Sequence, residues 1–134
     1  MIRYTVDADG LTADRLQGFF VGWREPRTPE EHLGILSGSD FIVLAIEEAT
    51  ERVVGYVTAI SDGVQAAFIP LLEVLPSHQG QGVGSELMRR MLVALEGIPC
   101  IDLMCDPAVQ PFYERLGMTR SVGMVRRAYS KENR

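Results

Sequence analysis

One stretch of the sequence decides the fold: Leu71-Leu72-Glu73-Val74-Leu75-Pro76-Ser77-His78-Gln79-Gly80-Gln81-Gly82-Val83-Gly84. An apolar run ends at Pro76, three glycines follow at alternate positions, and an amphipathic segment begins at Ser85. Backbone N–H groups at the start of a helix attract anions, and glycines let a ligand approach the backbone closely. This order predicts a strand, an anion-binding turn and the N-terminus of a helix.

The segment after the glycines reads as a helix over residues 85–96, with Leu87, Met88, Met91 and Leu92 on one face. Gly97 and Pro99 end it, and residues 100–105 form a short apolar strand. A helix between two strands implies a parallel pair with a right-handed crossover. We therefore expect the strands at 66–75 and 100–105 to run in the same direction.

Apolar periodicity and turn residues predict the remaining elements. Thr28 and Glu31 form a capping-box pattern at the start of a helix. The expected elements are strands at 1–6, 40–47 and 53–60, helices at 13–21, 29–36 and 109–116, and a closing hairpin of 118–120 with 124–129, before frayed residues 130–134. The prediction is an α/β fold in one domain, 1–134: a mixed, mostly antiparallel sheet with one parallel pair and about four helices.

Composition narrows the class of protein. The chain has 134 residues, 46% of them hydrophobic, and a net charge of −5, which argues against nucleic acid as a partner. No apolar run approaches the ~20 residues that span a bilayer, and no signal-peptide pattern is present, so we expect a cytoplasmic protein without a membrane partner. Cys100 and Cys105 are expected as small buried residues on opposite faces of a strand, and the sequence indicates no metal site.

Three phosphate-binding patterns compete for the glycine turn. A P-loop is excluded because no lysine follows the glycines, and a dinucleotide fingerprint is disfavoured because Ser85 stands where the third glycine would be. The third pattern, Gln-x-x-Gly-x-Gly, is present from Gln79 to Gly84 and suits a pyrophosphate. The alternative is a tight strand-to-helix connection without a ligand.

A second segment, Phe112-Tyr113-Glu114-Arg115-Leu116-Gly117-Met118, lies 28 residues after Gly84. Together the two segments resemble the signature of the GNAT acyltransferase superfamily, whose members take an acetyl group from acetyl-coenzyme A. The resemblance covers roughly residues 40–129. It implies acetyl-coenzyme A as co-substrate and a splayed pair of strands in the sheet.

The resemblance also implies roles for the residues of the turn. The backbone of Gln79, Gly80, Gln81, Gly82, Val83 and Gly84 would wrap the pyrophosphate, with Ser85 adding a hydroxyl, and the main chain of Leu72, Val74 and Leu75 would pair with the pantetheine arm. The residues add one observation of their own. Pro70 cannot donate to a sheet ladder, so the strand is expected to break or diverge there, unless it simply begins at Leu71.

Two residues are candidates for acid–base chemistry. Glu73 is the only acid in its apolar run, so it is a general base, the member of an ion pair, or solvent-facing. Tyr113 is the general acid by resemblance, or else a core tyrosine on a helix. A phenol remains protonated near neutral pH and can donate to a departing thiolate.

Other polar residues are weaker candidates. By resemblance Trp23, Glu25 and Phe20 fall in the acceptor wall, and Asp106 either caps the next helix or contacts the amine. We expect His78 to face solvent. His32 is expected on a surface helix, and Glu47, Glu48 and Glu51 in a solvated turn.

The resulting hypothesis is an N-acetyltransferase acting on a primary amine, most simply a small molecule. A non-catalytic acyl-coenzyme A sensor and a protein lysine or N-terminal acetyltransferase are the alternatives. Whether the chain forms a homodimer is left open.

Overall fold

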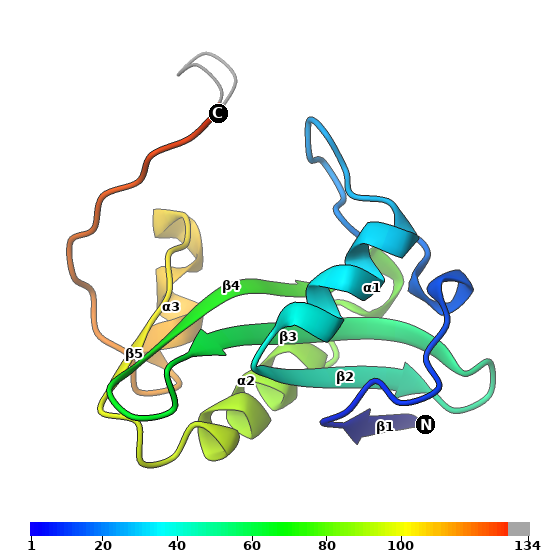
Figure 1. The fold of residues 1–134 in the computed structure, drawn as a ribbon, viewed down its shortest axis with the longest axis horizontal. Coiled ribbons are helices and arrows are strands. Elements are labelled where there is room, and N and C mark those ends of the chain that lie inside the picture. Colours follow the sequence, from blue (N-terminus) through cyan, green and yellow to red (C-terminus); the bar gives the residue numbers. More distant parts are fainter. Residues whose placement is uncertain (129–134) are drawn as a thin grey trace.

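The computed structural model describes residues 1–128 (Figure 1). Five strands form one sheet in the order β1-β2-β3-β4-β5, antiparallel except for the parallel pair β4 and β5. The strands are β1 (Ile2–Thr5), β2 (Phe41–Glu47), β3 (Arg52–Ser61), β4 (Ala66–Val74) and β5 (Cys100–Asp102). The helices are η1 (Ala13–Leu16), α1 (Pro29–Gly38), η2 (Pro76–His78), α2 (Val83–Ala94), η3 (Pro107–Val109) and α3 (Gln110–Glu114). The predicted mixed sheet is confirmed.

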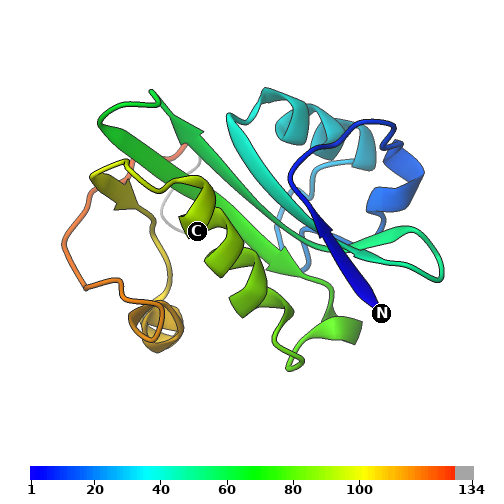
Figure 2. The ribbon, with the colours of Figure 1, turned by 90° about the horizontal axis from the view of Figure 1, so that it is seen from below.

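Helices cover both faces of the sheet. On one face α2 packs so closely that a Cβ on Gly55 would lie 3.0 Å from Leu87 Cδ1. The next residue, Tyr56, points to the opposite face and contacts His32 of α1, because side chains alternate along a strand. Figure 2 shows α1 and α2 on opposite sides of the sheet. The central strands β2 and β3 are therefore buried on both faces, as their continuous apolar runs predict.

Helix α1 begins at Pro29, as the sequence predicts, whereas α2 begins two residues before its predicted start at Ser85. Thr28 Oγ1 accepts from the N–H of Glu31, and the Glu31 side chain accepts from the N–H of Thr28, which completes the capping box of α1. Helix α2 begins at Val83, directly after the glycine turn. Among residues 1–128, no helix is long and apolar enough to cross a membrane.

Strands β4 and β5 pair only over the short segment Ala66–Phe68 with Cys100–Asp102. Beyond Phe68 the two strands have no paired residues, whereas β4 itself continues through Pro70 to Val74. The strand is therefore not broken at Pro70, but its partner is lost there, because proline has no N–H to donate. The predicted divergence of the parallel pair is present.

Three of the predicted elements are wrong. The helix over 13–21 is only the single turn η1, because Gly18, Phe20 and Gly22 all have positive φ and cannot continue a helix. The strand over 100–105 ends at Asp102. Cys100, on the edge strand β5, is exposed and Cys105 is half-buried, so the prediction that both are buried is wrong. Residues 118–128 form no closing hairpin. Tyr129 and residues 130–134 lie outside the described part.

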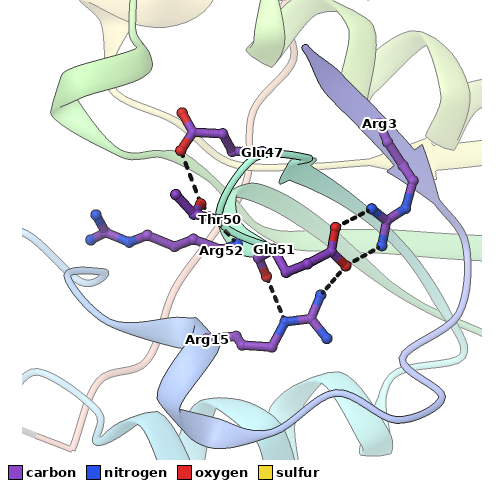
Figure 3. A network of polar contacts seen from close by, with 6 residues as sticks. All are labelled: Arg3, Arg15, Glu47, Thr50, Glu51 and Arg52. Carbon is purple, nitrogen blue, oxygen red and sulfur yellow. Dashed lines mark hydrogen bonds and ion pairs between the residues drawn. The ribbon is translucent and has the colours of Figure 1, made fainter.

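The turn between β2 and β3 is more than a solvated loop. Figure 3 shows the Glu51 carboxylate between Arg3 of β1 and Arg15 of η1, with bonds of 2.8 and 2.9 Å from the Arg3 guanidinium. Hydrogen bonds from Arg3 lower the pKa of Glu51. The interaction joins the edge strand, the first helical turn and the β2–β3 turn.

Candidate active site

The glycine turn leaves backbone N–H groups free at the start of α2. Gly80 (φ 76°) and Gly82 (φ 84°) adopt left-handed conformations, which only glycine enters without strain. The first intrahelical bond is donated by Glu86 to Gly82, so the N–H groups of Val83, Gly84 and Ser85 have no acceptor within the helix. A hypothetical Cβ on Gly80 or Gly82 would meet no atom within 4 Å. The turn is an open cradle of amides.

A hollow of about 310 Å³ lies over this cradle. Its lining contains no acidic residue: Val74, His78, Gln79, Gly80, Gly82, Val83, Gly84, Ser85 and Phe112. The cradle therefore presents N–H groups and the positive end of the α2 dipole without an opposing carboxylate in its lining.

The two glutamines of the turn use their side chains to hold its shape. Gln79 Nε2 donates to the carbonyl of Val74 at 2.9 Å, and Gln81 Nε2 donates to the carbonyl of Ser77 at 3.4 Å. Gln81 does not line the hollow. The side chains of both glutamines therefore stabilise the backbone conformation of the turn, and the sequence analysis did not predict these two contacts.

His78, expected to face solvent, is tied to the sheet instead. Its Nε2 lies 3.0 Å from Glu47 Oε2, and Ser77 Oγ lies 2.8 Å from its Nδ1. The hydrogen bond to His78 lowers the pKa of Glu47. This contact anchors the strand-to-turn corner on β2.

The end of β4 offers a free backbone edge beside the cradle. The N–H of Leu75 donates to Val54 of β3. Because N–H groups alternate in direction along a strand, those of Leu72 and Val74 point to the other side, where β5 has diverged. Leu72 and Val74 thus keep the free edge predicted for them, whereas the N–H of Leu75 already belongs to the sheet.

Glu73 lies on the opposite face of β4 from Val74 and is bonded to a loop rather than to a cation. The N–H of Phe20 donates to its Oε1 at 2.9 Å, and the N–H of Val21 donates to its Oε2 at 3.2 Å. Phe20 has φ 62°, which is unusual for a bulky residue and directs two successive N–H groups at one carboxylate. Each oxygen keeps a further lone pair.

Beneath Glu73 is a buried polar cluster that the sequence did not reveal. His32, predicted on the helix surface, is fully buried, and its ring lies 4.3 Å from the Tyr56 ring. Among the described residues, neither nitrogen of His32 has a hydrogen-bond partner, and the Tyr56 hydroxyl lies near the Glu73 carboxylate. Burial lowers the pKa of His32 to about 4, and burial with the neighbouring Glu73 raises that of Tyr56.

Of the residues predicted to form the acceptor wall, only Phe20 and Trp23 lie together near Glu73. Trp23 packs edge-on against Phe20 with ring centroids 4.9 Å apart and is 48% exposed, so it lies beside the loop that Glu73 holds. Glu25 is exposed. Asp106 occupies the N-cap position of η3 without a side-chain capping bond, so its predicted capping role is wrong.

Phe112 and Tyr113 face different hollows. Phe112 lines the hollow over the glycine turn, whereas Tyr113 lines a larger one of about 390 Å³ next to β5. Burial, followed by the neighbouring Cys105, raises the pKa of Tyr113, so its phenol is protonated at neutral pH. Helix α3 therefore places an apolar ring toward the cradle and a proton donor toward β5.

These features fit a coenzyme A molecule. The cradle has unpaired amides for a pyrophosphate, and Leu72 and Val74 offer main-chain groups to amides of an extended arm. Within residues 1–128 no cluster of three or more His, Cys, Asp or Glu side chains could hold a metal ion.

Comparison with known proteins gives the family. The model of the acetyltransferase (GNAT) family matches residues 9–118. The chain is 34% identical over 120 residues to "GCN5-related N-acetyltransferase 1, chloroplastic" of Arabidopsis thaliana and 32% identical over 122 residues to "Serotonin N-acetyltransferase 2, chloroplastic" of Oryza sativa. Each match covers 87% of this chain but only 60% and 61% of the relative.

Solved structures agree. A Deinococcus radiodurans protein assigned as an acetyltransferase shares 45% identity with a TM-score of 0.92, covering 98% of this chain and 92% of that one. A GNAT-family acetyltransferase of Streptococcus pneumoniae shares 27% identity with a TM-score of 0.77, covering 97% and 100%. The chain therefore belongs to the GNAT acetyltransferase family.

Proposed function

We propose that this chain transfers an acetyl group from acetyl-coenzyme A to the primary amine of a small molecule. The observation that carries the proposal is the cradle of free N–H groups at Val83, Gly84 and Ser85, open beside the free edge of β4. Dependence on acetyl-coenzyme A is general in the family to which the chain belongs. The backbone from Gln79 to Ser85 would hold the pyrophosphate, and Leu72 and Val74 the pantetheine arm.

The chemistry needs a base and an acid. When bound, acetyl-coenzyme A supplies an acetyl thioester. Glu73 accepts the proton that the amine must lose before its nitrogen bonds to the acetyl carbon, since an amine with pKa ~10.4 is almost fully protonated near neutral pH. Tyr113 donates its phenolic proton to the sulfur as the carbon–sulfur bond breaks, and burial keeps that proton in place beforehand.

The acceptor side would be formed by Glu73, Phe20 and Trp23. An aromatic ring and a carboxylate are the groups that attract an ammonium ion. The rice relative is named for serotonin, an arylalkylamine, which supports a small amine as substrate. A soybean relative, 33% identical over 109 residues, is named a histone acetyltransferase, and it supports protein acetylation as the second candidate.

A screen for amine-dependent thiol release from acetyl-coenzyme A tests the proposal. The panel contains arylalkylamines, polyamines, amino sugars and a lysine-rich peptide. We expect release above the amine-free rate with at least one small amine, together with an acetylated product in the mass spectrum. Release with the peptide alone would instead support protein acetylation. Tight binding of acetyl-coenzyme A without release for any acceptor would indicate a sensor. The expectation of a cytoplasmic location stays a prediction.

A further inference from the structure

Three fully buried polar side chains lie together on the sheet face that α1 covers: His32 of α1 and Tyr56 and Thr58 of β3. Tyr56 and Thr58 share this face because side chains two apart on a strand point the same way. Within residues 1–128 their polar atoms form no hydrogen bond of good geometry, and only the Tyr56 hydroxyl lies near a charged group, the Glu73 carboxylate. Buried polar groups are normally paired, so this cluster needs an explanation beyond packing.

The register of the sheet places Tyr56 beside Glu73. The two residues are direct cross-strand neighbours in the antiparallel pair β3 and β4. Such neighbours share a face, with Cβ atoms about 5 Å apart. Burial raises the pKa of Tyr56, and the charge of Glu73 and hydrogen bonding to it raise the pKa further. The phenol therefore keeps its proton and is able to donate it in a hydrogen bond to Glu73.

The ring of Tyr56 is held in place by other rings. Its centroid lies 4.3 Å from that of His32 and 5.1 Å from that of Phe19. Burial lowers the pKa of His32 to about 4, so this neighbour is neutral near neutral pH and does not pair with Glu73 as a cation. The enclosed ring thus keeps its hydroxyl at one place beside the carboxylate.

We propose that Tyr56 is a positioning residue for Glu73, whose carboxylate its hydroxyl holds from the sheet while the loop holds it from the other side. The inference rests on the proposed function, in which Glu73 accepts the proton of the amine. Tyr56 is fully buried, so it touches no substrate and acts only through Glu73.

The number of donors fits this role. A carboxylate has about four acceptor sites. The N–H groups of Phe20 and Val21 occupy two of them, and the Tyr56 hydroxyl would occupy a third, which leaves one for the amine. Donors from the loop and from β3 together would keep the Glu73 side chain from rotating away from the acceptor, and a base must be held in place to act efficiently.

Thr58 supplies a matched control. Its hydroxyl is also fully buried, on the same face of the same strand. Its cross-strand neighbours are Ile42 and Leu71, so it faces no carboxylate across either strand pair. Tyr56→Phe and Thr58→Val each remove one buried hydroxyl and keep the shape of the side chain, and circular dichroism checks that both variants are folded.

The first test is kinetic and uses an amine found in the screen for thiol release. We expect Tyr56→Phe to lower kcat by about tenfold or more with KM for acetyl-coenzyme A unchanged, and Thr58→Val to keep kcat within about twofold of wild type. In a Glu73→Gln background, Tyr56→Phe should cause no further decrease, because the base that it positions is already lost. Equal effects of the two single variants, or the same fold-decrease in both backgrounds, would overturn the proposal.

The second test needs no acceptor and no turnover. We expect the N–H groups of Phe20 and Val21 to exchange with solvent about tenfold faster in Tyr56→Phe than in Thr58→Val, because a carboxylate that is no longer held releases them. Exchange in β2 should be the same in both variants. Equal exchange of the two loop N–H groups, or a loosening of β2 to the same extent as the loop, would overturn the proposal. Absence of thiol release with every acceptor would contradict the proposed function instead and would leave this measurement decisive for Tyr56.

Discussion

At the scale of single residues, Glu73 combines two tasks. Its carboxylate accepts from the N–H groups of Phe20 and Val21, which fixes the loop that carries the proposed acceptor wall. The same carboxylate is our candidate base. The sequence singled out Glu73 because an acid inside an apolar run needs an explanation. The loop contact could not be foreseen, because it depends on the left-handed conformation of Phe20.

The variant Glu73→Gln separates these tasks. Loss of the base lowers kcat about 10²- to 10⁴-fold near neutral pH, and the deficit shrinks as pH rises and more amine is deprotonated. A residue that only holds the loop would instead raise KM for the amine and lower the melting temperature, with kcat unchanged at every pH. Steady-state kinetics across pH and a thermal scan of both proteins measure this difference.

His32 shows why a buried residue on a weakly patterned helix is missed. Helix α1 contains Gly34, Ser37 and Gly38, so its apolar face is hard to recognise. The one available signal is the spacing of His32 and Leu36, four residues apart and both buried.

Stability should depend on pH through His32. The folded state takes up the proton only near the lowered pKa of about 4, whereas the unfolded chain takes it up near ~6.5. The unfolded state binds more protons in that window, so the free energy of unfolding falls as pH decreases from about 7 to about 4.5, by ~1–3 kcal/mol. His32→Leu should lack this part of the decrease. Urea unfolding of both proteins at the two pH values is the measurement, and identical decreases would contradict it.

At the scale of elements, the glycine turn could be predicted and the segment before α1 could not. An apolar run, spaced glycines and an amphipathic segment in this order are compatible with few local structures. The structure has the predicted order of strand β4, glycine turn and helix α2. Residues 13–21 have the apolar spacing of a helix, yet positive φ at Gly18, Phe20 and Gly22 produces a loop. In this loop the N–H groups of Phe20 and Val21 donate to Glu73, which is distant in the sequence, so a tertiary contact overrides the local helical pattern.

Substitution of Gly82 should lower the stability of the folded protein, because this residue has a positive φ. Gly82→Ala forces a Cβ into the left-handed region, at about 1–2 kcal/mol. Gly63, in the β3–β4 turn, has φ 78° and the same open surroundings, so Gly63→Ala is a matched control with a similar cost. Thermal unfolding should therefore give similar decreases in melting temperature for both variants. A decrease confined to one of them would show that strain at φ is not the common cause.

At the scale of the whole molecule, the glycine turn and the segment from Phe112 to Met118 predict the family and the mixed sheet, but the conformation of the chain after Met118 was predicted wrongly. The parallel pair and its divergence after Phe68 follow from Pro70 and the crossover helix. The hairpin expected over 118–129 is absent from the described residues, although its apolar pattern is real.

The most direct test of the account is a calorimetric titration of coenzyme A into wild type, Gly82→Ala and Gly63→Ala. We predict tight binding to wild type and to Gly63→Ala. Binding to Gly82→Ala should be weaker by about tenfold or more, because a Cβ strains the left-handed conformation that aims the amides of the cradle, and hydrogen bonds to a charged group are worth ~1.5–3 kcal/mol each. Equal affinities for all three proteins, or no binding to wild type, would contradict the claim that the glycine turn holds the pyrophosphate.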